Sequence, residues 1–86
     1  MDTEVAELII RDVYSLAATR QGQWVSLTKI REQAGIDRAT FDATVRRMGR
    51  QSGVTVVPED DQKTLRRADR DAAVVIGGKA YHKIQM

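Results

Sequence analysis

Residues 27–48 decide the fold, and they read LTKIREQAGIDRATFDATVRRM. Apolar residues recur three or four positions apart in this stretch, which is the spacing of one face of an α-helix. The spacing predicts two helices, the second running to about residue 51, joined by a turn at residues 35–37. Ser26 and Asp37 are expected to cap them, because a side-chain oxygen can accept hydrogen bonds from the free N–H groups at a helix start. The side chains expected to face inward are Leu27, Ile30, Ala34, Phe41, Val45 and Met48.

The preceding residues, 3–20, predict another helix, because apolar side chains again recur at helical spacing. Gly22 suits the left-handed position that ends many helices. Trp24 and Val25 then form a short extended piece, with Trp24 partly buried. The side chains of this helix expected to face inward are Val5, Leu8, Ile9, Val13 and Leu16.

The following part of the chain predicts two strands with an insertion between them. Residues 54–57 are mostly β-branched and predict a strand, which Pro58 ends. Residues 68–76 predict a short helix that two glycines break. Residues 81–86 alternate and predict a final strand. The inward side chains of the short helix would be Ala72, Val75 and Ile76.

The totals describe one small globular chain. Its 86 residues suit a single domain, and its hydrophobic content of 42% and charged content of 30% are those of a folded protein. The absence of cysteine excludes disulfides and thiolate metal sites and favours the cytoplasm. No apolar stretch approaches the ~18 residues of a membrane span. The net charge is +2, but residues 26–58 hold six basic against three acidic side chains, so the positive excess lies on the two-helix stretch.

The predicted order is helix, short strand, helix, helix, strand, insertion, strand, and in this order the chain resembles the winged helix-turn-helix family of DNA-binding domains. The best-matched part is residues 30–48. The resemblance implies an α+β fold, with a three-helix core, a short strand and a two-stranded C-terminal wing. The single domain would span residues 1–86, with the helix-turn-helix at about 27–51 and the elaborated wing at about 54–86.

Two features depart from the family pattern. The family often has a small residue just after the position of Ile30, whereas this chain has Arg31, which is expected to extend to solvent. The family usually joins its last two strands by a short loop, whereas this chain has about 23 residues between them. The wing therefore carries a long insertion, or that insertion packs back on the core.

The third helix presents a candidate face for reading DNA. With Phe41 at the centre of the buried side, a turn of 100° per residue places Ala39, Ala43, Arg46 and Arg50 on the opposite side. Small side chains there allow close approach to base edges, and arginines can reach guanine or phosphate. Asp42 is expected to pair with Arg46, or else to accept from cytosine. The candidate DNA-binding residues of this helix are Arg38, Ala39, Thr40, Asp42, Ala43, Arg46, Arg47 and Arg50.

The insertion adds basic side chains, which are Lys63, Arg66, Arg67, Arg70 and Lys79. In the resembled family, basic residues of the wing often reach the neighbouring minor groove or DNA phosphates, and Lys63, Arg66 and Arg67 are the candidates for DNA binding. The equal alternative is that Asp69 and Asp71 neutralise the basic side chains as solvated pairs. No enzyme, cofactor or metal site is expected, because His82 is the only histidine and no nucleophile accompanies it.

The sequence therefore predicts sequence-specific binding of duplex DNA, by a small transcriptional regulator or a DNA-associated accessory protein. The third helix would enter the major groove. A homodimer is expected because one such helix reads few base pairs, with Ile10, Tyr14 and the final strand as candidate dimer surfaces. The alternative is a winged-helix adaptor that holds another protein in a larger complex without reading DNA. Neither a membrane nor a small-molecule substrate is implied.

Overall fold

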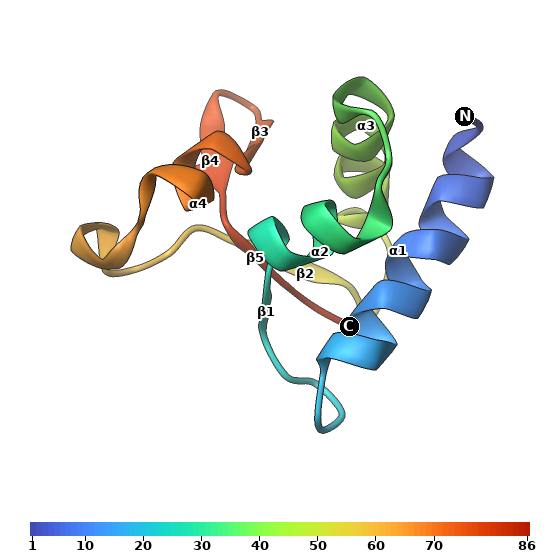
Figure 1. Ribbon diagram of the computed structural model, residues 1–86, viewed down its shortest axis with the longest axis horizontal. Helices are drawn as coiled ribbons and strands as arrows, with labels where there is room; N and C mark the ends of the chain where they lie inside the picture. Colours follow the sequence, from blue (N-terminus) through green and yellow to red (C-terminus); the bar gives the residue numbers. More distant parts are fainter.

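The computed structural model describes residues 1–86 as an α+β fold with four α-helices and antiparallel strands (Figure 1). Three helices pack together at the N-terminal end of the chain. They are α1 (Thr3–Ala17), α2 (Leu27–Ala34) and α3 (Arg38–Met48). None of the helices combines the length and the apolar character needed to cross a membrane.

Side-chain caps determine where these helices begin. The Ser26 side chain accepts a hydrogen bond from the Lys29 N–H at the start of α2, and the Asp37 carboxylate accepts from the Thr40 N–H at the start of α3. Gly35 follows α2 with a φ of 63°, a left-handed conformation that costs glycine nothing. The predicted caps and turn between α2 and α3 are confirmed, although α3 ends at Met48 rather than near residue 51.

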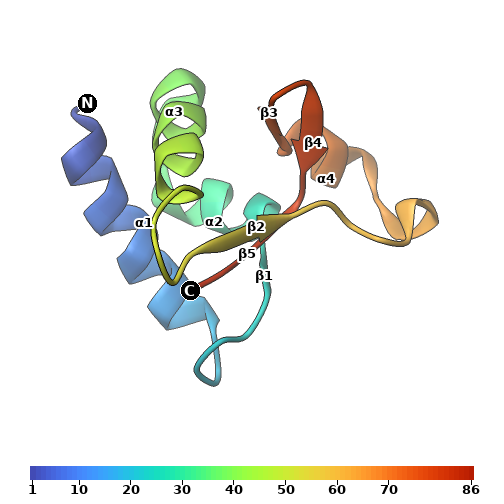
Figure 2. The same cartoon turned by 180° about the vertical axis from the view of Figure 1, so that it is seen from behind.

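A three-stranded sheet lies beneath the helices, and its middle strand is the last one in the chain. β5 (Lys83–Gln85) pairs antiparallel with β1 (Val25–Ser26) on one side and with β2 (Thr55–Val57) on the other. Figure 2 shows β2 and β5 side by side. The fully buried Ile84 stands opposite Val25 and Val56 in this register, so it joins the sheet to the core.

The residues between β2 and β5, 58–82, are called the insert. They form a short 3-10 helix, η1 (Gln62–Thr64), a one-turn helix, α4 (Arg67–Asp71), and a hairpin of β3 (Val74–Ile76) and β4 (Lys79–Tyr81). The prediction of one helix over 68–76 is therefore wrong in its second half. The run Val74, Val75, Ile76 is β-branched, and the two glycines at 77 and 78 take φ values of 58° and 79°, which suit a tight hairpin turn. Val75 points outward, with 48% of its surface exposed.

α1 buries a face that only partly matches the predicted one, since Val13 is buried and Ile9 is half-buried against the core as expected. The helix ends at Ala17 rather than at residue 20. The buried side chains are Ala6, Ile10, Val13 and Tyr14. The expected dimer residues Ile10 and Tyr14 are thus in the core, and the Tyr14 hydroxyl donates to the Gln23 carbonyl at 2.5 Å. Three side chains expected to be inward are exposed instead, namely Val5, Leu8 and Leu16.

Arg31 is not directed to solvent but joins α2, α3 and the insert. Its guanidinium lies 4.3 Å from the centre of the Phe41 ring, and the whole side chain is only 15% exposed. It donates to the Asp42 carboxylate at 2.7 Å and to the Ala72 carbonyl of the insert at 2.9 and 3.2 Å. The prediction that Asp42 pairs with Arg46 is therefore wrong. The packing of α2 against α3 brings Arg31 to Asp42 instead.

The ion pair of Arg31 and Asp42 is expected to stabilise the fold substantially. Asp42→Ala should lower the free energy of unfolding by about 3 kcal/mol, because it leaves a largely buried guanidinium without a counter-charge. Urea denaturation followed by circular dichroism measures this. Arg67→Ala is the matched control, since its pair with Asp71 spans 3.9 Å with the side chains 95% and 72% exposed, and it should change stability by less than about 0.5 kcal/mol. Equal effects of the two variants would contradict the role given to Arg31.

Candidate nucleic-acid interface

The outer side of α3 carries the small and basic side chains that the sequence places there. Phe41, Val45 and Met48 are fully buried against the core. The side chains on the opposite side, Ala39, Ala43, Arg46 and Arg50, are exposed, and Arg38 is exposed to one side of them. The predicted division of α3 into an inner and an outer side is confirmed.

Arg46 and Arg50 form no ion pair with any carboxylate of the chain. Arg46 donates through Nε to the carbonyl of Val75 at 2.8 Å, so its remaining N–H groups stay available. Both arginines line a shallow groove between the end of α3 and the hairpin. The end of α3 is therefore a site of uncompensated positive charge, the kind of surface that attracts phosphate.

At the start of α3, most hydrogen-bonding groups already have partners within the chain. The Asp37 carboxylate accepts from both the N–H and the hydroxyl of Thr40, at 3.0 and 2.9 Å, and these bonds hold the pKa of Asp37 below its usual value. Arg38 donates to the Asp71 carbonyl at 2.7 Å and lies 4.0 Å from Asp42. Thr40 is thus engaged, whereas the Arg38 side chain is largely exposed.

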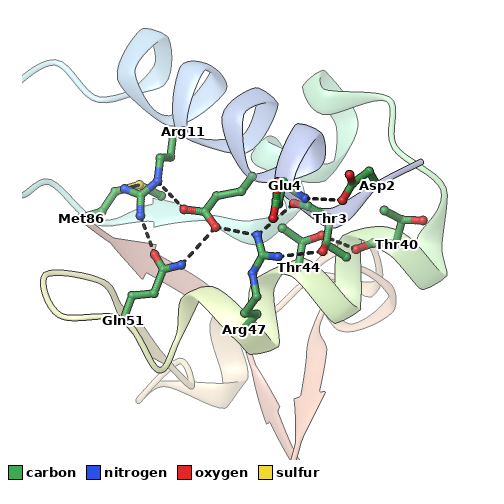
Figure 3. Close-up of polar contacts among 10 residues, drawn as sticks. Asp2, Thr3, Glu4, Arg11, Thr40, Thr44, Arg47, Gln51 and Met86 are labelled. Carbon is green, nitrogen blue, oxygen red and sulfur yellow. Dashed lines mark hydrogen bonds and ion pairs between the residues drawn. The ribbon is translucent and has the colours of Figure 1, made fainter.

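Arg47 lies on the side of α3 that faces α1 and is held there. It donates to the Thr3 hydroxyl and backbone carbonyl, and at 2.7 Å to the Glu7 carboxylate. Figure 3 shows Arg47, Arg11 and Gln51 converging on one carboxylate between the two helices, and that carboxylate belongs to Glu7. Hydrogen bonds from Arg11, Arg47 and Gln51 lower the pKa of Glu7 from 4.5 to about 2. The structure therefore separates Arg47 from the outer arginines.

The basic candidates of the insert do not gather beside α3. Arg66 pairs with Asp69 at 3.4 Å, Arg67 is close to Asp71, and Lys63 has no ion pair. Figure 1 shows η1 far from α3, while the β3–β4 hairpin stands next to α3. The solvated pairs offered as the alternative are thus present for Arg66 and Arg67.

The hairpin brings Tyr81 of β4 to the groove beside α3, and Lys79 of β4 stands opposite Ile76, which also lines that groove. Lys79 was named as a basic residue of the wing, but neither side chain was predicted to lie beside α3. The signal that could have found them is two glycines between two short runs that can pair, which is typical of a hairpin with a two-residue turn. No three His, Asp or Glu side chains lie together in an arrangement that could hold a metal ion.

Comparison with models of known families, with curated proteins and with solved structures finds no match for this chain. Any function must therefore be argued from the side chains themselves and from how the fold arranges them.

The Glu7 network is expected to make stability depend on pH. Because the pKa of Glu7 is lower in the folded state, the charged carboxylate stabilises the fold above pH 4.5, and this stabilisation is lost as pH falls from 4.5 toward about 2. Glu7→Gln should remove part of the acid-induced loss of stability, as measured by urea unfolding at several pH values in that window.

Glu4→Gln provides the control for that measurement, because Glu4 also lies on α1 but is exposed and forms no ion pair. It should leave the pH dependence nearly unchanged. A residual dependence is expected in Glu7→Gln, since hydrogen bonds from Thr40, Asp61 and Thr28 also lower the pKa values of Asp37, Glu59 and Asp69 respectively. An identical pH profile for wild type and Glu7→Gln would contradict the role of Glu7.

Proposed function

We propose that this chain is a winged helix-turn-helix domain that binds duplex DNA, with α3 in the major groove and the insert as its elaborated wing. The observation that carries the proposal is the outer side of α3. It combines two exposed alanines, which allow close approach to base edges, with Arg46 and Arg50, which have no acidic partner. The order of helices and strands, and the pairing of β2 with β5, support the same assignment.

The pairing of Asp42 supports the proposal by removing an objection to it. A free carboxylate on a groove-reading helix would repel phosphate. Asp42 is 16% exposed and is neutralised by Arg31 at 2.7 Å. The side of α3 offered to DNA therefore keeps its positive charge.

In this proposal the side chains of α3 have distinct roles. Ala39 and Ala43 lie against base edges, where an alanine methyl suits the methyl group of thymine. Arg46 and Arg38 use their free N–H groups on guanine or on phosphate. Arg47 positions α3 on α1 rather than contacting DNA, because Glu7 and Thr3 engage it.

We also propose that two copies pair through the exposed side of α1. One α3 helix reads few base pairs, and a two-fold dimer doubles the recognised sequence. Leu8 and Leu16, 69% and 78% exposed, lie with Val5 on the side of α1 that faces away from the core. Burial of such side chains against their counterparts is favourable.

Duplex DNA binding is tested by an electrophoretic or fluorescence titration at several salt concentrations. Affinity should fall steeply as salt rises, because phosphate contacts release counterions. Ala43→Glu should weaken binding by about tenfold or more, since it places a carboxylate against the DNA. Gln21→Glu adds the same charge in the exposed loop between α1 and β1 and should have little effect. No binding at low salt would overturn the proposal, and salt-insensitive binding of another protein would favour the adaptor alternative.

The dimer is tested by sedimentation equilibrium. Wild type should sediment at twice the mass of the chain, and Leu8→Glu should sediment as a monomer, because a buried carboxylate disfavours the interface. Leu8 is exposed in the single chain, so the variant should keep its circular dichroism spectrum and unfolding midpoint. A monomeric wild type at concentrations that saturate DNA would show that one copy binds alone.

A further inference from the structure

We propose that the groove between the end of α3 and the β3–β4 hairpin binds one phosphate group of the DNA backbone, with Arg50, Lys79 and the Tyr81 hydroxyl as its donors. The inference rests on the proposed function, and it adds two residues of the insert to the DNA-binding surface. The groove has a volume of about 150 Å³. Its lining residues are Arg46, Gly49, Arg50, Val56, Ile76 and Tyr81.

The hairpin register places Lys79 and Tyr81 on the same side of the hairpin. Ile76 stands opposite Lys79, and Val74 stands opposite Tyr81. Residues opposite one another in an antiparallel pair share a face, and so do residues two apart along a strand. Ile76 and Tyr81 line the groove, so Lys79 belongs to the face of the hairpin that borders it.

The groove has donors and charge but no acidic side chain. None of its lining residues is Asp or Glu, and neither Arg46, Arg50 nor Lys79 forms an ion pair with a carboxylate. The Tyr81 hydroxyl makes no hydrogen bond within the chain. Two guanidinium groups and a hydroxyl line the opening, and the ammonium of Lys79 belongs to the face of the hairpin that borders it. Together they form a set of donors that suits an oxyanion.

The position of the groove favours a phosphate of the DNA that α3 would read. Arg46 lies on the outer side of α3, about one turn beyond Ala43, and Arg50 follows two residues after the end of the helix. The hydrogen bond from Arg46 to the Val75 carbonyl holds the hairpin against α3, so the donors of both elements are arranged before binding. A phosphate contact of this kind positions a protein on the duplex and carries no sequence information.

The test compares Arg50→Gln, Lys79→Gln and Tyr81→Phe with wild type in titrations of labelled duplexes of several sequences. Arg50→Gln should weaken binding about tenfold and Tyr81→Phe about threefold, by the same factor on every duplex. Arg50→Gln and Lys79→Gln should each reduce the slope of log affinity against log salt by about 1. Arg20→Gln is the matched control, because the loop joining α1 to β1 lies far from the hairpin (Figure 1), and it should bind as wild type.

The outcomes separate this inference from the proposed function. If wild type binds duplex DNA and the groove variants bind as tightly, with unchanged salt slopes, the groove inference fails and the DNA proposal stands. If the variants change the preferred sequence, the groove contacts bases and the phosphate assignment is wrong. If wild type binds no duplex at low salt, both fail. Circular dichroism checks that each variant is folded.

Discussion

The rest of the structure depends on the buried guanidinium of Arg31. Three elements meet at this group: α2 supplies it, α3 supplies Asp42 and the Phe41 ring, and the insert supplies the Ala72 carbonyl. A buried charge is tolerated only when it is paired and hydrogen-bonded. Arg31 Nη1 is buried without a hydrogen-bond partner. The fold therefore depends on the bonds that Nε and Nη2 donate to the Asp42 carboxylate and the Ala72 carbonyl. This requirement holds the insert to the helix pair and turns Asp42 inward.

The two flanks of α3 are held by different chemistry. On one flank the Glu7 carboxylate collects Arg11, Arg47 and Gln51 and joins α1 to α3. On the other flank, arginines of α2 and α3 donate to main-chain carbonyls of residues 71, 72 and 75. What stays exposed is a narrow strip of α3 between α1 and the hairpin. The proposed interface therefore depends both on which arginines are bound within the fold and on which remain free to bind a partner.

Local rules were enough to predict the centre of the fold. The caps at Ser26 and Asp37, the turn at residues 35–37 and the inner side of α3 depend on neighbouring residues only, and all four are confirmed. The buried side of α1 was not predictable in the same way. Its sequence is apolar on more than one side, and the choice depends on Tyr14 reaching the Gln23 carbonyl in the following loop.

The partners of the arginines also lie beyond what sequence spacing can show. Arg46 lies four residues from Asp42, but the closer guanidinium comes from α2, eleven positions away in the chain. Residues 68–76 were predicted as a helix because Ala72, Val75 and Ile76 recur at helical spacing. The β-branched run 74–76 forms a strand instead, and its first residue, Val74, is fully buried in the core, which is a tertiary contact. The groove beside α3 is formed by the hairpin, so it could not be predicted without predicting the hairpin first.

The attachment of the hairpin by its main chain has a consequence for its length. Arg46 recognises the carbonyl of Val75 and not a side chain, so the outer part of the hairpin can change in sequence without loss of that bond. The hairpin can nevertheless lengthen only by two residues per strand at a time if its side chains are to keep their faces. One residue added to each strand would turn every outer side chain to the other face, whereas two would restore the faces and extend the hairpin by about 7 Å. The reach of this element along a partner surface can thus vary only in even steps.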